Sequence, residues 1–220
     1  MCPIFIHPNL KKSIPDLALG CVSANVTVVK TCEPLWNEID QHLNNLTASI
    51  KAEQINSLPQ IAAMRSAYKV LGKDPSRYRG SAEALLRRVL SGKGMHQINN
   101  IVDINNLVSL EFLNPAGVYD LEKIAAPAEL RIGTGGESYK GIGKDLINIE
   151  NLPVFADKNG AFGSPTSDSE RAMVRLETRQ VLMVIFSFAG SDGLPRWVER
   201  ACNLLRRYGA AQGIEINVVT

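Results

Sequence analysis

The order of the expected elements along the 220 residues of the chain predicts an α+β fold. Segments with the apolar spacing of helices dominate the stretch between residues 33 and 113. After Pro115, short runs rich in β-branched residues alternate with Gly, Asp and Asn turns. The regular strand–helix alternation of a parallel α/β sheet is missing, which argues against that class.

The first elements are one or two strands within Leu17–Val29, where β-branched residues alternate loosely with others. Glu33 and Pro34 begin a helix, because proline is favoured in the first helical turn. Its buried face is expected to carry Leu35, Ile39, Leu43 and Leu46. A second helix follows Pro59, and Gly72 is expected to end it as a C-cap.

A third helix is predicted to begin at Ser81, the expected N-cap. Glu83 in its first turn suits the helix dipole, and Gly92 and Gly94 end it. The fourth helix, about Ile98 to Leu113, is apolar almost all round. Such a helix must be buried on most sides.

The rest of the chain is expected to be mainly strands. Leu152–Ala156 and the residues after Gly160 form a predicted β-hairpin with Asp157–Gly160 as its turn. Val181–Phe188 is a fully apolar strand, Arg196–Tyr208 a basic amphipathic helix and Ile214–Val219 a closing strand. We expect residues 56–220 to form one domain and residues 1–55 to be an N-terminal strand and helix extension packed on it.

Composition excludes several classes of protein. No stretch approaches the roughly 20 apolar residues of a membrane span, and the N-terminus lacks the pattern of a secretory signal. The four cysteines are scattered, without a CxxC pair, so we expect idle thiols in a cytoplasmic protein and no metal site. The net charge of +2 is too small to indicate nucleic-acid binding without local clustering.

Patterns of common enzyme classes are also missing. The glycine-rich stretch Arg131–Asp145 does not lead from a strand into a helix and lacks the serine or threonine of a P-loop, so structural turns are the better interpretation. None of the three histidines neighbours a nucleophile elbow. Covalent serine or cysteine catalysis is therefore not expected, and no organic cofactor is indicated.

One segment does concentrate positive charge. Between residues 77 and 93 the only acid is Glu83. The bases there are Arg77, Arg79, Arg87, Arg88 and Lys93. Such a cluster is either a solvated surface or a surface that faces RNA phosphates, and the basic helix Arg196–Tyr208 favours the second interpretation.

Polar residues follow the cluster in two places. Asn99, Asp103 and Asn106 form one stripe on the apolar fourth helix, which is either its only wet side or the wall of a pocket. In Ser164–Arg171 the spacing of Ser167 and Glu170 fits a capping box at a helix start. The alternative is a polar wall that holds water or a substrate ammonium through Asp168 and Glu170.

Several motifs occur together in consistent order between about Ala62 and Ile214: NNIVDINNLVSLEF, NPAGVYDLEKI, LRIGTGGE, the hairpin and LETRQVL. In this combination the chain resembles the tRNA-binding B3/B4 module of the phenylalanyl-tRNA synthetase beta chain. The segment YKVLGKDPSRYRGSAEALLRRVLSGKG is more similar to free-standing versions of the module than to the synthetase itself. In the synthetase this module hydrolyses tyrosine wrongly attached to tRNA. The resemblance implies a three-layer domain with a β-sandwich of unusual topology flanked by helices.

The resemblance also implies a site. Asn106 and Glu170 would take part in catalysis. With Asp168 of the polar segment, the pocket would be lined by Asn105, Pro115, Gly117, Tyr119, Asp120, Glu137 and Ser169. Gly117 stands where the synthetase carries a histidine, and its missing side chain would leave room for an amino acid other than tyrosine.

The resulting hypothesis is a free-standing editing hydrolase that binds aminoacylated tRNA and cleaves the ester of a mischarged amino acid. An activated ester needs a positioned water and polar groups around the carbonyl. The alternative is a non-catalytic module that binds tRNA or a free amino acid, with Gly117 as a sign of lost activity. The substrate amino acid and the oligomeric state stay open.

Overall fold

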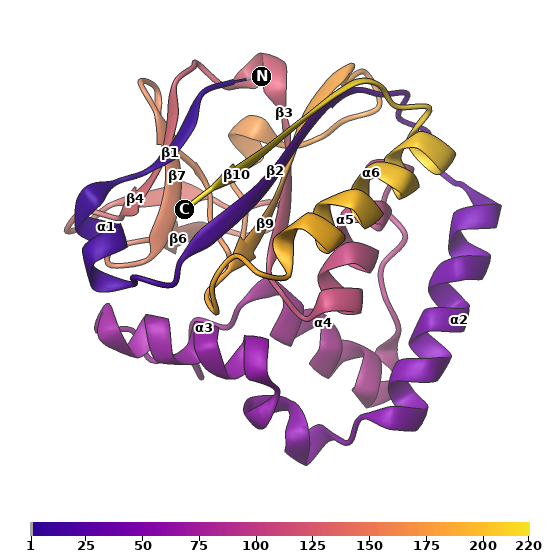
Figure 1. Ribbon diagram of the computed structural model, residues 1–220, viewed down its shortest axis with the longest axis horizontal. Helices are drawn as coiled ribbons and strands as arrows, with labels where there is room; N and C mark the ends of the chain where they lie inside the picture. Colours follow the sequence, from indigo (N-terminus) through magenta and orange to yellow (C-terminus); the bar gives the residue numbers. More distant parts are fainter. Residues whose placement is uncertain (1) are drawn as a thin grey trace.

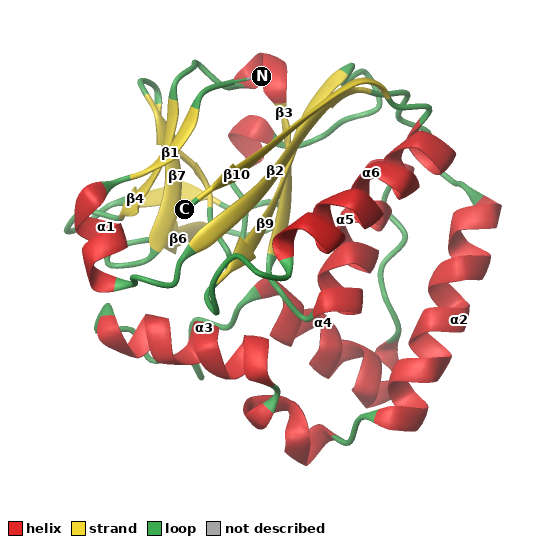
Figure 2. Cartoon of the chain, viewed as in Figure 1, coloured by secondary structure: helices red, strands yellow, loops and turns green. Residues whose placement is uncertain are grey.

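The computed structural model describes residues 2–220 and shows three layers, two β-sheets and a layer of helices (Figures 1 and 2). The outer sheet A contains, in spatial order, β1 (Ile4–Ile6), β4 (Ala128–Ile132), β7 (Pro153–Asp157) and β8 (Gly160–Gly163). The central sheet B contains, in spatial order, β10 (Gln212–Val219), β2 (Ala18–Asn25), β9 (Gln180–Ser187) and β3 (Ala116–Asp120). A separate hairpin pairs β5 (Ser138–Lys140) with β6 (Leu146–Asn148).

The helices lie mainly on the face of sheet B that points away from sheet A (Figure 1). The α-helices are α1 (Pro8–Ser13), α2 (Glu33–Ser49), α3 (Pro59–Val70), α4 (Ser81–Arg88), α5 (Asn100–Phe112) and α6 (Leu194–Gly209). Short turns of 3₁₀ or π-helix are η1 (Ala52–Ser57), η2 (Val89–Lys93), η3 (Leu121–Lys123) and η4 (Glu170–Ala172). None of the helices in residues 2–220 is long and apolar enough to cross a membrane.

Sheet B separates two hydrophobic cores. On β9, Leu182, Val184 and Phe186 point into the sandwich against sheet A. Val181, Met183 and Ile185 point to the opposite side, against α5 and α6. This strand is buried on both faces, which explains why its sequence is continuously apolar instead of alternating.

The structure confirms the predicted α+β class and the three-layer arrangement. The helices expected at residue 33, after Pro59 and near Ile98 are present, as are the hairpin and the two last strands. Gly72 follows the end of α3 with φ of 76°, the left-handed backbone that a C-cap glycine adopts. The third helix is shifted by one residue, since Gly80 rather than Ser81 is its N-cap.

The division of the chain at residue 55 is corrected by the sheet topology. β2, which precedes this boundary, lies between β10 and β9 in sheet B, and β1 pairs with β4 in sheet A. The segment before the boundary therefore supplies strands to both sheets instead of forming an extension. The apolar pattern of a strand does not indicate which strands it pairs with, so the positions of β1 and β2 in the two sheets could not be predicted from the sequence.

Candidate functional site

Three of the residues predicted for the site, Gly117, Tyr119 and Asp168, meet where β3 faces the loop that follows β8. Tyr119 of β3 points into the sandwich, and its ring lies across Gly117 and Gly163. A Cβ atom added at Gly117 would lie 2.3 Å from the Tyr119 hydroxyl, and one added at Gly163 would lie 2.4 Å from its ring. The space left by the missing histidine side chain is therefore filled by Tyr119, which corrects the expectation that Gly117 leaves room for a ligand.

The Tyr119 hydroxyl donates a 2.9 Å hydrogen bond to Oδ1 of Asp168, which also accepts from the backbone N–H of Ser164 at 3.3 Å. Burial raises the pKa of Asp168 to about 7, although these hydrogen bonds act in the opposite direction. Burial and the neighbouring Asp168 raise the pKa of Tyr119, so this hydroxyl keeps its proton at neutral pH. The pair joins a hydrogen-bond donor to a carboxyl group that titrates near neutrality.

Two further tyrosines hold the loop that carries Asp168. Tyr68 of α3 shares a 2.8 Å hydrogen bond with the hydroxyl of Thr166, and Tyr139 of β5 donates to the carbonyl of Ser167. The loop is thus fixed by hydroxyl groups from three separate elements. Such preorganisation is needed for a group that must act in one position.

The hairpin β5–β6 covers this loop. The backbone N–H of Ile142 donates to the carbonyl of Asp168 at 3.1 Å, and Gly141 forms a β-bridge with Ser169. Lys144 reaches the hydroxyl of Ser167 at 3.3 Å. Asp168 therefore lies between the sandwich and the tip of the hairpin, half-buried and next to a lysine.

Asn105 of α5 lies beside the start of β3. Its Nδ2 donates to the carbonyl of Ala116 at 3.2 Å, whereas its Oδ1 is buried and has no hydrogen-bond partner in residues 2–220. The first residue of α4, Ser81, donates its backbone N–H to Pro165 at 2.8 Å. A Cβ added at Gly80 would lie 3.4 Å from Pro115. The start of α4, the start of β3 and the Asp168 loop are thus neighbours.

Three other predicted pocket residues have structural partners. Asp120 accepts from the hydroxyl of Thr178 at 2.8 Å and caps η3. Glu137 forms an ion pair with Arg131 at 2.7 Å, and hydrogen bonds from that guanidinium lower the pKa of Glu137 to about 2. Ser169, not Ser167, is the N-cap of η4, which replaces the predicted capping box.

The two residues predicted for catalysis lie in different layers. Asn106 is half-buried on α5, in the helix layer, and none of the hydrogen bonds among the described residues involves its side chain. Glu170 lies in η4, next to β8 of sheet A, and forms a 3.1 Å ion pair with Lys140. Of the predicted residues, Tyr119 and Asp168 are joined directly by side-chain hydrogen bonding, while these two are not.

Two of the three residues in the polar stripe on α5, Asn99 and Asp103, belong neither to a wet side nor to a pocket wall. Asn99 is buried and caps the helix by accepting from the N–H of Val102. Asp103 is fully buried and accepts from the indole of Trp36 at 2.9 Å and from the N–H of Ile98 at 3.0 Å. The stripe satisfies backbone groups and fastens α2 to α5.

The basic cluster divides into paired and unpaired side chains. Arg87 is bound to Glu83 at 2.9 Å, and Glu83 also pairs with Arg65 at 3.0 Å. Arg88 donates to the carbonyl of Lys93. The side chains of Arg77, Arg79 and Lys93 are exposed, and none of them has an ion pair among residues 2–220.

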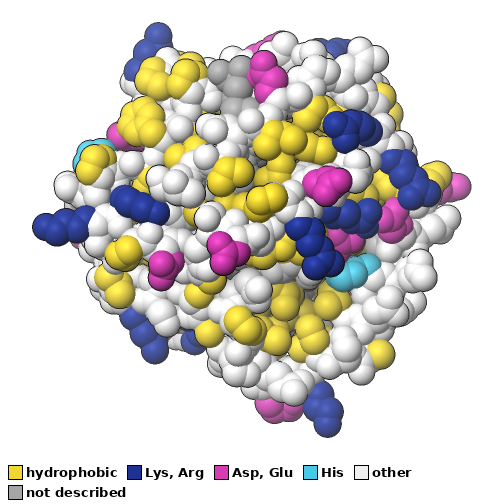
Figure 3. Space-filling model, in the orientation of Figure 1, with side chains coloured by type: hydrophobic (Ala, Val, Ile, Leu, Met, Phe, Trp, Pro, Cys, Tyr) yellow, Lys and Arg dark blue, Asp and Glu magenta, His cyan; other side chains and the backbone are white. Residues whose placement is uncertain are grey.

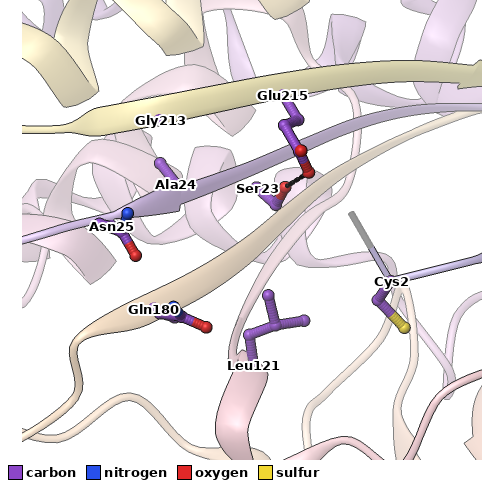
Figure 4. Close-up of a pocket in the computed structure, with 8 residues that line it drawn as sticks. All are labelled: Cys2, Ser23, Ala24, Asn25, Leu121, Gln180, Gly213 and Glu215. Carbon is purple, nitrogen blue, oxygen red and sulfur yellow. Dashed lines mark hydrogen bonds between the residues drawn. The ribbon is translucent and has the colours of Figure 1, made fainter.

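A polar cleft of about 280 Å³ lies elsewhere, where β2, β9 and β10 meet η3 (Figure 4). Ser23 donates to Glu215 at 3.3 Å inside it. Its other lining residues are Cys2, Ala24, Asn25, Leu121, Gln180 and Gly213. None of the predicted site residues lines this cleft, so it is separate from the Tyr119–Asp168 site.

Fold and site together define a three-layer α+β domain with a tyrosine–aspartate pair where its sandwich meets the β5–β6 hairpin. The family model of the B3/4 domain matches residues 63–194, more than half of the chain. The chain belongs to the B3/4 domain family, as its motifs predicted.

Similar proteins include beta subunits of phenylalanine–tRNA ligase. The chain is 31% identical to that of Desulfotalea psychrophila over 124 residues, which are 55% of the chain and 14% of the relative. It is 36% identical to that of Ralstonia nicotianae over 90 residues, 40% of the chain and 11% of the relative. The matches thus span a small part of these long relatives.

A solved structure is similar over nearly the whole chain. An N-terminal fragment of the phenylalanyl-tRNA synthetase beta subunit from Pyrococcus horikoshii covers 99% of this chain with a TM-score of 0.50, and the chain covers 50% of the fragment. The sequence identity is 11%, so this likeness shows the fold.

Proposed function

We propose that this protein binds aminoacylated tRNA and hydrolyses the ester that links a mischarged amino acid to it. The observation that carries the proposal is the hydrogen bond between Tyr119 and Asp168, in a member of the B3/4 domain family. A carboxyl group with a pKa near the working pH is suited to remove a proton from water. The proposal implies that the protein works in the cytoplasm, because charged tRNA is used there.

Asp168 would act as the general base. Its Oδ1 accepts from Tyr119 and Ser164, whereas none of the hydrogen bonds among the described residues reaches its Oδ2. That oxygen would accept a proton from a water molecule as the water attacks the ester carbonyl. When the bond between the carbonyl carbon and the ribose oxygen breaks, the carboxyl would return the proton to that oxygen. The Tyr119 hydroxyl stabilises the ionised form of Asp168 and fixes its orientation.

Asn105 and Asn106 are proposed to contact the aminoacyl group of the substrate beside the edge of β3. The buried Oδ1 of Asn105 lacks a partner in residues 2–220, and an unpaired buried oxygen costs roughly 1–3 kcal/mol. A substrate ammonium or a bound water would satisfy it. Glu170 is partly exposed beside Lys140 and is proposed to contact the tRNA end or the amino acid rather than water.

The acceptor end of the tRNA is proposed to lie along the cations near the start of α4. Arg77, Arg79 and Lys93 are exposed and carry no ion pair within residues 2–220, so their charge is available to phosphates. Arg87 is already engaged by Glu83, and Arg88 by a backbone carbonyl. These two arginines are proposed to contribute less to RNA binding.

The test is ester loss from a panel of correctly and wrongly charged tRNAs incubated with the pure protein. We expect hydrolysis of at least one mischarged tRNA, a rate that rises with pH to a plateau above about 7, and a loss of roughly 10²–10⁴-fold in Asp168→Asn. Asn106→Ala and Glu170→Ala test the other proposed contacts. The matched control is Asp192→Asn, an exposed acid before α6, which should hydrolyse normally.

The second candidate is a binding module without catalysis. The observation that favours it is the Tyr119 ring, which fills the space above Gly117. Retention of tRNA without hydrolysis of any member of the panel would establish this candidate and reject the hydrolase. Hydrolysis that persists unchanged in Asp168→Asn would reject Asp168 as the base.

A further inference from the structure

β10 is a long strand at the edge of sheet B. It pairs with β2 over its length, and within residues 2–220 no strand pairs with its other side. Figure 1 shows β10 as the yellow strand that borders the sheet. An edge strand of eight residues presents alternate backbone N–H and C=O groups outward, which is a template for pairing with another strand.

The side chains of β10 do not protect this edge. Ile216 is 54% exposed and Val218 is 39% exposed, and both lie on the face of the sheet that carries α6. Natural edge strands are usually guarded by lysine, proline or a bulge in the middle of the strand. In β10 the irregularity lies at its beginning, between Gln212 and Glu215, which leaves the apolar part regular.

A groove between β10 and α6 continues the apolar surface. It is lined by Pro195, Val198, Cys202 and Asn203 of the helix and by Ile216 and Val218 of the strand. Figure 3 shows apolar side chains gathered along β10 beside α6, with acidic and basic groups next to them. Glu199 and Arg206 are the charged residues of this groove.

The placement of these two charges is self-complementary. Glu199 and Arg206 are seven residues apart, so they lie on one face of α6 and about 10 Å apart along its axis. Cys202 and Asn203, midway between them, line the same groove as Ile216. A two-fold axis near Ile216 would bring Glu199 of each copy towards Arg206 of the other.

We propose that two copies of this protein form a symmetric dimer through antiparallel pairing of their β10 strands. A central sheet of eight strands then runs through the dimer, and the two grooves close against each other. With the axis at Ile216, Glu215 faces Asn217 of the partner copy, so no like charges oppose each other across the new strand pair. The inference is independent of the proposed hydrolysis.

Sedimentation velocity of the full chain at micromolar concentrations tests the proposal. We expect a dimer for the unchanged protein and a monomer for Ile216→Lys and for Val218→Lys, whose charges would be buried in the interface. Val70→Lys is the matched control, because Val70 is 64% exposed on α3, away from β10, and should leave the dimer intact. Circular dichroism verifies that each variant is folded.

Charge reversal tests the two-fold arrangement. Glu199→Arg and Arg206→Glu should each raise the dimer Kd by at least about tenfold, since every reversal acts twice in a symmetric interface. The double variant should recover most of the affinity. A monomeric unchanged protein, a dimer that survives Val218→Lys, or a double variant no better than the single ones would each overturn the proposal.

Discussion

The ring of Tyr119 lies directly over Gly117, and the two residues occupy the same face of β3. Replacing Gly117 by alanine would place a Cβ 2.3 Å from the tyrosine hydroxyl, so the ring must move. We expect Gly117→Ala to lower the free energy of unfolding by about 1–3 kcal/mol, as overpacked cores do. Thermal denaturation measures this. Gly135→Ala is the control, since a Cβ there meets nothing within 4 Å; equal effects of the two would contradict the close approach.

The raised pKa of Asp168 predicts that stability falls as pH rises. The unfolded carboxyl ionises near 3.8, while the folded one ionises near 7, so between these values unfolding releases a proton. The stability linked to this group is full below about pH 4 and is lost as pH rises through about 7. The cost is on the order of 1 kcal/mol for each pKa unit.

Asp168→Asn tests this dependence, because asparagine can still accept from Tyr119 and does not ionise. We expect the variant to be more stable than the unchanged protein above pH 7 and its stability to vary less between pH 4 and 7. Melting temperatures across this range provide the measurement. Parallel curves for the two proteins would show that Asp168 ionises normally.

Substitutions in the ion-pair cluster around Glu83 are expected to lower the stability by unequal amounts. The residue is 2% exposed and holds both Arg65 and Arg87, so Glu83→Ala removes two pairs and leaves two cations close together. We expect it to cost about 1–3 kcal/mol of stability. Arg87→Ala leaves Arg65 in place and should cost less than about 1 kcal/mol. Urea denaturation compares them, and equal losses would refute the shared role of Glu83.

The salt dependence of tRNA binding distinguishes the exposed arginines without an ion pair from Arg87, which is paired with Glu83. Replacing Arg77 and Arg79 together by alanine should reduce the slope of log K against log salt by about 0.7–0.9 for each phosphate that the variant no longer neutralises. Arg87→Ala should change it little, because that side chain is engaged by Glu83. Lys158→Ala, in the β7–β8 turn, is the control. An unchanged slope in the double variant would assign Arg77 and Arg79 to the solvated surface.

Local signals predicted much of this fold. Pro34 and Pro59 mark helix starts and Gly72 a helix end, because these residues have backbone preferences that neighbours rarely override. The strand β1 was not predicted. It has three residues and pairs in parallel with β4, whose Ala128 is opposite Ile4, and such long-range pairing leaves no local pattern.

The sequence predicted a candidate site as a set of residues and not as an arrangement. Tyr119 and Asp168 were both expected to line the pocket, yet they are 49 positions apart and their hydrogen bond depends on how β3 faces the loop. Asp103 shows the same limit. Its side chain lies neither on a wet side nor in a pocket wall, and the partner that it bonds instead, Trp36, lies 67 positions away and leaves no local pattern.

The burial of β9 on both faces has a consequence for the exchange of its amide hydrogens with solvent. Its backbone amides lie between two cores and between β2 and β3, so local fluctuations at the surface do not reach them. Their hydrogens should exchange with deuterium only when the whole domain unfolds. The slowest exchange rates of β9 would therefore report the global stability of the domain, while the hairpin β5–β6 exchanges far sooner.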